Sequence, residues 1–420
     1  MGSGLASLPS GFAPETDAAA PDTSTASGGA TSAGGEDAGP LDAAADDARA
    51  EDAGFSASSA ISAGGSHTCA VTASGGALCW GLNFDGQLGD GSHEDSPAPV
   101  AVAGLASGVS AIASGGAHSC ALTTAGAALC WGWNANGQLG DGSVTDSASA
   151  VKVSGLGSAP IAIAAGGAHS CALLHGGAVQ CWGFNAYGQL GDGSTTDSAV
   201  PVSVVGLGAG VVALAAGNAH TCALTGAGAV QCWGYGYYGQ LGDGAETQDS
   251  VSPVAVKGLA APATAIANGG THSCAVVAGD VWCWGNNQVG QLGNASCAST
   301  DVSENSCVDS PVAVQVVGLD GGVTAITAGE AHTCAIAGGS AFCWGWNIDG
   351  QLGNGVTADS PVPVAVSHLG AGARAISAGD LQTCAIVAGG AVACWGGDVD
   401  GQLGNGSSVG TAVPGAVTGL

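Results

Sequence analysis

GGAHSCALLHGGAVQCWGFNAYGQLGD, residues 166–192, contains the pattern that decides the fold of this chain. The pattern is Gly-Gly-x-His-(Ser/Thr)-Cys-Ala, then Cys-Trp-Gly, then Gly-Gln-Leu-Gly, and close variants of it recur seven times. The Gly-Gln-Leu-Gly tetrads begin at Gly86, Gly137, Gly188, Gly239, Gly290, Gly350 and Gly401. The successive intervals are 51, 51, 51, 51, 60 and 51 residues, so only the fifth unit carries an insertion. A period near 50 is typical of propellers and solenoids, in which each unit buries its apolar face against a neighbour.

Each unit is interpreted as four short strands. In the third unit, runs rich in Ala and β-branched residues at 162–166, 169–174, 178–182 and 200–205 are separated by turns that contain glycine. No segment shows sustained apolar residues at helical spacing, so we expect little helix. Seven four-stranded units suit closure into a ring, which leaves only the outermost edges exposed. The sequence therefore predicts an all-β fold, a seven-bladed β-propeller of four-stranded blades.

These repeats resemble those of the regulator of chromosome condensation family, whose units carry a Gly-x-x-His segment, a Trp-Gly strand end and a Gly-Gln-Leu-Gly turn. The resemblance covers about residues 60–420, and every unit contributes to it. It implies a seven-bladed propeller, and it also implies guanine-nucleotide exchange on small GTPases through one propeller face. No segment here matches the family's exchange wedge, and the basic chromatin-binding tail is replaced by an acidic one. The sequence leaves two ways in which the ring can close. The strand at 412–418 completes the last blade alone, or it pairs with the segment that enters at Ser56.

The charge balance restricts the class of partner. The chain has 32 acidic residues and 4 basic ones, with a net charge of −28. Because binding to a phosphate backbone requires Lys and Arg, we expect no nucleic-acid partner. No Gly-Lys-(Ser/Thr) is present to form a phosphate-binding loop. Strong acidity favours solubility or a basic partner.

Residues 1–55 differ in composition from the rest of the chain. Ala, Gly, Ser, Thr, Pro and Asp dominate, with ten acidic residues between Glu15 and Asp52. Such a segment cannot bury enough apolar surface to fold, so we expect a disordered acidic leader or stalk before a propeller at 56–420. The first residues lack the basic and apolar regions of a signal peptide. The longest apolar runs are too short to span a bilayer.

Sixteen cysteines form a regular set of pairs, seven that repeat once per blade and an eighth in the insertion. The pairs are Cys69 with Cys79, Cys120 with Cys130, Cys171 with Cys181, Cys222 with Cys232, Cys274 with Cys283, Cys334 with Cys343, Cys384 with Cys394, and Cys297 with Cys307. In each blade the two members lie on consecutive strands at a spacing that can place them opposite each other, at a Cα distance that suits a disulfide. We predict eight disulfides, which implies an oxidising, extracytoplasmic compartment. The alternative is that these are reduced cysteines, buried as small apolar side chains.

The histidine of each repeat could indicate a metal site. His67, Cys69 and Cys79 offer three zinc ligands, but a structural zinc site uses four ligands, and Gln382 replaces histidine in the seventh unit. We interpret these histidines as core residues that bond to backbone. Asn83, Asp85 and Asp90 could suggest a calcium site. However, the type of residue at the Asp85 position changes from unit to unit, so we interpret these side chains as turn formers rather than calcium ligands. We expect no metal and no cofactor.

Catalysis is also disfavoured. There is no Gly-x-Ser-x-Gly motif, and no unique Cys stands beside a unique His. A catalytic site needs residues with different roles, whereas these polar residues repeat from blade to blade. A shallow catalytic site at the central opening of the ring is an alternative that the sequence does not exclude. We expect a protein that is not an enzyme.

One tryptophan per blade follows the second cysteine. These residues are Trp80, Trp131, Trp182, Trp233, Trp284, Trp344 and Trp395, and we expect them to pack between blades. Ultraviolet-B receptors in the family sense light through clustered Trp beside Arg-rich surfaces. Such surfaces are missing here, which disfavours photoreception.

The fifth unit inserts nine residues, which form a polar loop between Cys297 and Cys307. Loops on a stiff scaffold commonly carry recognition, although the insertion can also be a tolerated surface loop. The candidate partner-binding residues are Asp301, Glu304 and Asn305 in this loop, and Tyr187, Tyr235, Tyr237 and Tyr238 in neighbouring turns.

The sequence thus predicts a monomeric, extracytoplasmic interaction scaffold, secreted, periplasmic or at the cell surface, that binds a protein or a surface polymer. Two alternatives stay open. One is regulation of a small GTPase, implied by the resemblance. The other is inhibition of an extracellular enzyme, because related secreted propellers hold β-lactamases with aromatic loops.

Overall fold

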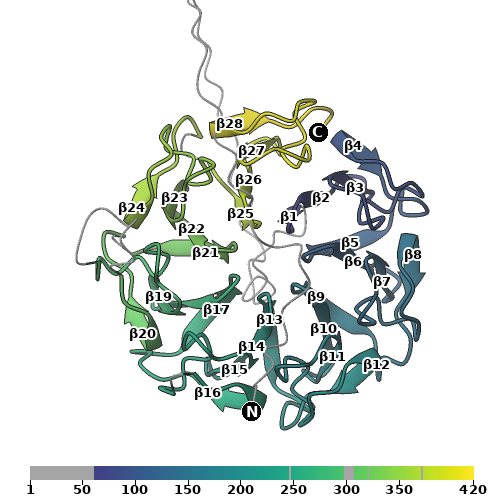
Figure 1. Cartoon of the computed structure of the whole chain (residues 1–420), viewed down its shortest axis with the longest axis horizontal. Coiled ribbons are helices and arrows are strands. Elements are labelled where there is room, and N and C mark those ends of the chain that lie inside the picture. Colours follow the sequence, from purple (N-terminus) through teal and green to yellow (C-terminus); the bar gives the residue numbers. More distant parts are fainter. Residues whose placement is uncertain (1–60, 246, 298–306, 320, 370–371) are drawn as a thin grey trace, which may run out of the picture. The chain divides into compact units, whose positions relative to one another are not determined.

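A computed structural model describes residues 61–245, 247–297, 307–319, 321–369 and 372–420. The described chain forms seven four-stranded antiparallel sheets in sequence order. Figure 1 shows these sheets as blades around a central axis, with the first strand of each blade innermost and the fourth outermost. The prediction of an all-β, seven-bladed propeller is confirmed. The predicted acidic leader, residues 1–55, lies outside the described residues.

The four strands of each blade have recurring lengths. The innermost strands are β1 (Ile61–Ala63), β5 (Val109–Ser114), β9 (Pro160–Ala165), β13 (Val211–Ala216), β17 (Ala263–Asn268), β21 (Val323–Ala328) and β25 (Ala375–Ala378). The second strands are β2 (His67–Val71), β6 (His118–Thr123), β10 (His169–Leu174), β14 (His220–Thr225), β18 (His272–Val277), β22 (His332–Ala337) and β26 (Gln382–Ile386). The third strands are β3 (Ala77–Gly81), β7 (Ala128–Gly132), β11 (Val179–Gly183), β15 (Val230–Gly234), β19 (Asp280–Gly285), β23 (Ser340–Gly345) and β27 (Val392–Gly396). The outermost strands are β4 (Ser96–Ala101), β8 (Ser147–Lys152), β12 (Ser198–Ser203), β16 (Ser250–Ala255), β20 (Ser310–Gln315), β24 (Ser360–Ala365) and β28 (Thr411–Ala416).

The repeated cysteines lie opposite each other on the second and third strands. In the third blade Cys171 pairs in register with Cys181, and the two sulfur atoms are bonded. The Cα atoms of the seven repeated pairs are 4.0–4.1 Å apart, as expected for opposed residues between hydrogen-bonded rungs. The other six bonded pairs of this kind are Cys69 with Cys79, Cys120 with Cys130, Cys222 with Cys232, Cys274 with Cys283, Cys334 with Cys343, and Cys384 with Cys394.

The insertion of the fifth unit is closed by its own disulfide. Cys297 and Cys307 are bonded, and no described cysteine is free. The described chain therefore contains all eight disulfides that the spacing predicts. The alternative of reduced cysteines buried as small apolar side chains is not what the structure shows.

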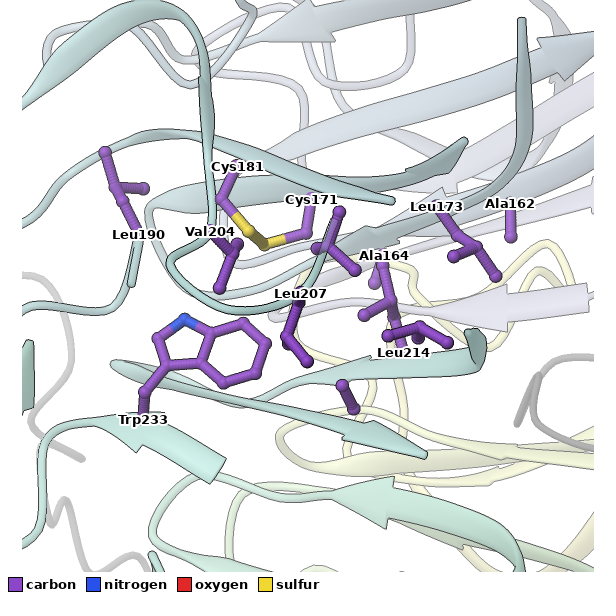
Figure 2. Packing of buried hydrophobic residues seen from close by; sticks show 13 residues of the cluster. Ala162, Ala164, Cys171, Leu173, Cys181, Leu190, Val204, Leu207, Leu214 and Trp233 are labelled. Carbon is purple, nitrogen blue, oxygen red and sulfur yellow. A yellow bond between two sulfur atoms is a disulfide. The ribbon is translucent and has the colours of Figure 1, made fainter. Parts of the chain in front are cut away.

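The hydrophobic core lies between adjacent blades. Figure 2 shows one such cluster, in which Trp233 of the fourth blade lies near Leu190 and Val204 of the third. The indole Nε1 of Trp233 donates a hydrogen bond to the Gln189 carbonyl of the third blade at 2.9 Å. All seven repeated tryptophans are fully buried and make the equivalent bond, so the prediction that they pack between blades is confirmed.

Steric contact explains why the last residue of the Gly-Gln-Leu-Gly tetrad is glycine. Gly191 has a positive φ of 67°, and a Cβ atom there would lie 2.6 Å from the indole nitrogen of Trp233. Glycine therefore permits the close approach of the next blade's tryptophan to the turn.

The ring closes through core packing, side chains and backbone hydrogen bonds such as that from Gly406 N–H to the Pro97 carbonyl, at 2.9 Å. The fourth strand of the last blade, β28, pairs with β27, and β1 pairs with β2, so the first and last blades exchange no strand within the described residues. β28 thus completes the last blade, as in the first of the two closures left open by the sequence; residues 56–60, on which the second closure depends, lie outside the described residues. Ile61 and Trp80 pack in one buried cluster with Leu403 and Val417. No helix in the described ranges is long and apolar enough to cross a bilayer.

Candidate functional site

Two sets of loops meet at one end of the ring. The inner loops join the first and second strands of each blade, and the outer loops join the third and fourth strands. They are tied together by backbone bonds such as that from Phe184 N–H to the Ala168 carbonyl, at 2.9 Å, which recur in every blade. We call this end of the propeller the loop face. These bonds hold the described backbone of the two loop sets together.

Five aromatic side chains gather on the loop face, in the outer loops of the third and fourth blades. The ring centroids of Tyr187 and Tyr235 are 4.8 Å apart, although the residues belong to different blades. Tyr237 lies 6.3 Å from Tyr235 with nearly parallel planes and 5.1 Å from Tyr238 edge-on. Phe184 contacts Tyr187 edge-on at 6.0 Å. The structure therefore brings together all four tyrosines proposed from sequence, and their part in partner binding stays a prediction.

A cavity of about 520 Å³ opens beside these tyrosines, between the fourth and fifth blades. Its lining comes from both blades and comprises Tyr237, Tyr238, Thr247, Gln288, Cys307, Val308, Asp309 and Pro311. The cavity thus touches the disulfide that closes the insertion. The other three proposed binding residues, Asp301, Glu304 and Asn305, lie outside the described residues.

The loop face is strongly acidic. Every described Asp and Glu except Asp280 lies in an inner or outer loop. Burial raises the pKa of Asp309 and of Asp249, and a backbone N–H bonded to each carboxylate works against this rise. Burial, followed by the neighbouring Tyr238, raises the pKa of Tyr235 to about 12, so this phenol is neutral at physiological pH.

The central opening holds three polar side chains that the sequence analysis missed. The inner loops carry glycine at the second position of the repeat in four blades, but Asn218, Glu330 and Asp380 replace it in the other three. Asn218 Nδ2 donates to Glu330 Oε2 at 2.6 Å, and all three residues line a cavity of about 80 Å³ on the axis. Burial and the nearby Glu330 carboxylate raise the pKa of Asp380 to about 7. The replacement of the second glycine of the Gly-Gly pair in these three blades was the feature of the sequence that could have revealed this cluster.

The repeated histidines bind hydroxyl groups of the next blade. His67 Nε2 lies 2.8 Å from Ser119 Oγ, whose proton is donated to the Gln87 carbonyl at 3.1 Å. Because that hydroxyl has one proton, Nε2 must donate, which fixes the tautomer with a bare Nδ1. The same arrangement recurs for His118, His169, His220, His272 and His332. Our expectation that the histidines bond to backbone was wrong, because each binds a hydroxyl side chain. Gln382, which replaces histidine in the seventh blade, donates instead to the carbonyls of Gly64 and His67.

The residues that could suggest calcium hold the outer loops instead. Asn83 Nδ2 donates to the carbonyls of Ser92 and Glu94, and Asp90 Oδ1 accepts the Ser92 N–H at 2.9 Å. The interpretation as turn formers is confirmed for Asn83 and Asp90. Within the described ranges, no cluster of three or more His, Cys, Asp or Glu side chains is arranged to hold a metal ion.

Comparison with known proteins gives consistent matches. A family model described as an RCC1-like domain matches residues 153–420, and models of the regulator of chromosome condensation (RCC1) repeat match residues 74–122 and 125–173. The chain is 33% identical to the ultraviolet-B receptor UVR8 of Arabidopsis thaliana over 282 residues, covering 66% of this chain and 62% of the receptor. It is 36% identical to the human E3 ubiquitin-protein ligase HERC2 over 225 residues, covering 52% of this chain and 5% of the ligase. The chain therefore spans less than two thirds of either relative.

Solved structures share the fold. Yeast RCC1 (Prp20), in a complex with Kap60, superposes with a TM-score of 0.71 at 23% identity, covering 82% of this chain and 83% of that one. Human WBSCR16 superposes with a TM-score of 0.67 at 24% identity, covering 77% of this chain and 84% of that one. At these identities the similarity establishes the architecture and not the activity.

Proposed function

The chain belongs to the RCC1 repeat family, and from this membership we propose that it is a non-enzymatic interaction scaffold whose loop face binds another protein or a surface polymer. The observation that carries this proposal is the tyrosine cluster beside the 520 Å³ cavity. Aromatic side chains are enriched at interaction surfaces because each supplies a large contact area. Strands that hold loops in place lower the entropy lost on binding.

We further propose that the protein works outside the cytosol. Eight disulfides in the described chain support this location, because disulfides persist in oxidising compartments and are rare in the cytosol. Each repeated disulfide links strands within one blade, so the blades should resist local opening. The strong acidity of the chain agrees with a soluble protein.

A second candidate function is regulation of a small GTPase, which family membership supports. Prp20p from Saccharomyces cerevisiae was studied for its binding properties to Gsp1p and histones. Its identity to this chain is 24%, and the activity is therefore a proposal here. Release of labelled guanine nucleotide from a panel of small GTPases would distinguish this function from plain binding. Inhibition of an extracellular enzyme is a further outcome, which loss of that enzyme's activity would reveal.

The proposed function is tested by capture on the immobilised protein with its disulfides intact. Extracellular and cell-envelope fractions of the source organism are passed over wild type, Tyr237→Ala and Ile348→Ala. Tyr237 and Ile348 occupy the same repeat position, and both are exposed, at 54% and 62%. Alanine stands at this position in the second and third blades, as Ala135 and Ala186, so both variants should fold.

We expect a partner that wild type and Ile348→Ala retain and that Tyr237→Ala loses. The partner is then identified by mass spectrometry and its binding repeated with the purified component. Equal retention by Tyr237→Ala and wild type would refute the tyrosine cluster as the binding surface.

A further inference from the structure

The outer loop of the fourth blade is built differently from those of the other six. Five blades have Asn and the seventh has Asp398 two residues after the conserved Trp-Gly, and this side chain accepts the N–H of the leucine in the Gly-Gln-Leu-Gly tetrad. The fourth blade has Gly236 there. A Cβ atom on Gly236 would collide with the Gln248 carbonyl, so the backbone of the loop occupies the space of the missing side chain.

This altered loop forms one wall of the cavity. The segment between Gly234 and Ser250 is one residue longer than its counterpart between Gly183 and Ser198. Thr247, in this longer segment, has a positive φ of 63°, which is uncommon for a β-branched residue, and it lines the cavity with Tyr237 and Tyr238. The blade with this altered loop therefore supplies both aromatic side chains in the described lining of the cavity, Tyr237 and Tyr238.

The cavity combines exposed aromatic surface with a carboxylate. Its volume of about 520 Å³ is within the range of small-ligand sites, and Tyr237 keeps 54% of its surface exposed. One oxygen of Asp309 accepts the Asn287 N–H at 2.7 Å, which fixes the carboxylate in the cavity wall. Aromatic faces attract cations, and a carboxylate beside them adds a charged partner.

No basic residue lines this cavity among the residues that the structure describes. Of the described basic residues, Lys152 ends an outermost strand and Arg374 precedes an innermost one, both at the end of the ring opposite the loop face. The side chain of Lys257 lies beside Gly244, whose N–H donates to the carbonyl of the lining residue Pro311, but Lys257 is not itself part of the lining. Asp309 is therefore the charged residue among the described lining residues, and its carboxylate favours a cationic ligand over an anionic one.

We propose that this cavity receives an arginine side chain of a partner protein, with the guanidinium against Tyr237 and Tyr238 and paired with Asp309. The inference rests on the proposed function, because it names the chemistry of the partner that the loop face binds. Arginine fits better than lysine, since its planar group stacks on aromatic rings and meets a carboxylate through two N–H groups.

The test uses hexa-arginine peptide and its neutral counterpart, hexa-citrulline, titrated into the full chain by isothermal calorimetry. Sodium chloride at about 150 mM screens surface charges beyond about 8 Å. The variants are Tyr237→Ala and Asp309→Asn, with Ile348→Ala and Asp359→Asn as matched controls. Asp359 accepts the Asn347 N–H at 2.7 Å in the sixth blade, as Asp309 does for Asn287 in the fifth.

We expect hexa-arginine to bind wild type and both controls with similar affinity, and hexa-citrulline not to bind. Tyr237→Ala and Asp309→Asn should each weaken hexa-arginine binding by about fivefold or more. Equal losses in the fifth-blade and sixth-blade aspartate variants would overturn the proposal, because they would indicate attraction to the acidic face as a whole. Undiminished binding by Tyr237→Ala would overturn it too.

This result is separable from the test of the proposed function. If Tyr237→Ala loses the captured natural partner but binds hexa-arginine as wild type does, the arginine site is refuted and the interaction surface stands. If the natural partner binds Tyr237→Ala as well as wild type, the interaction surface itself is refuted.

Discussion

The indole nitrogen of Trp80 donates a 2.9 Å hydrogen bond to the carbonyl of Gln402, which is 322 residues away in the sequence. The Thr68 hydroxyl donates to the same oxygen at 3.0 Å. At each of the other six blade junctions, one glutamine carbonyl also accepts two hydrogen bonds, one from an indole and one from a hydroxyl. For example, the Gln138 carbonyl accepts from Trp182 Nε1 and from Ser170 Oγ. The junction that closes the ring therefore keeps both of these hydrogen bonds, although Gln382 stands there in place of the histidine that binds the hydroxyl at the other six junctions.

Because both junctions keep these two hydrogen bonds, Trp80→Phe and Trp182→Phe should destabilise the protein to similar extents. Each change removes one buried hydrogen bond and leaves a void beside the last glycine of the preceding blade's tetrad, Gly404 for Trp80 and Gly140 for Trp182. The combined loss should be about 2 kcal/mol in the free energy of unfolding. Urea unfolding followed by circular dichroism measures both. A much smaller loss for Trp80→Phe would show that the closing junction is weaker than the others.

The buried histidines should make the protein sensitive to acid. Burial lowers the pKa of His169 to about 3, so the folded state keeps it neutral while the unfolded chain takes up a proton below about pH 6.5. The unfolded state binds more protons in this window, and stability should fall by about 1.4 kcal/mol per pH unit for each such histidine as the pH decreases.

His169→Gln tests this pH effect, since the seventh blade carries buried Gln382 at the equivalent position. The difference in unfolding free energy between variant and wild type should shift in favour of the variant as the pH falls from 7 towards 5. A difference that stays constant over that range would contradict the assignment.

Asp380 should make the stability of the protein depend on pH in the direction opposite to that of the buried histidines. Its raised pKa of about 7, caused by burial and by Glu330, means that the folded state takes up a proton which the unfolded chain binds only near pH 4. Stability should therefore decrease as the pH rises through this window. Asp380→Gly restores the residue that four other blades carry, and it should stabilise the protein at pH 8 but not at pH 4. Thermal melting at the two pH values measures this, and equal effects at both would argue against the buried carboxylate.

From the eight disulfides we predict the result of an alkylation experiment. The native protein, alkylated under denaturing conditions without reduction, should gain no mass, and after reduction it should gain the mass of sixteen alkyl groups. Free thiols in the unreduced sample would contradict the paired state and favour an intracellular protein.

Removal of one disulfide should be tolerated. Each repeated bond closes a short loop, and Cys171→Ala combined with Cys181→Ala should cost about 2 to 3 kcal/mol of unfolding free energy. The same double change at Cys120 and Cys130 is the matched control, because both bonds span ten residues between opposed strands. Urea midpoints of the two variants should agree, and complete loss of folding in one alone would assign that bond a special role.

The sequence by itself determined the blades, their number and the disulfide pairs. A blade is a meander of neighbouring strands, so its register follows from local spacing, and Cys171 had to face Cys181 once the two strands formed a hairpin. The seven repeats, and the tryptophan in each, then required that neighbouring blades cover one another. The insertion and the tyrosines were also visible as departures from the repeat.

Tertiary structure alone decided which residues meet across blades. Asn218 reaches Glu330 from 112 residues away because the ring brings the inner loops of the fourth and sixth blades to one opening. The hydroxyl partner of each histidine, the approach of Tyr187 to Tyr235, and the cavity wall shared by Tyr237 and Asp309 depend in the same way on how blades are placed side by side. Local spacing cannot specify these distances, since they are set by the curvature of the closed ring.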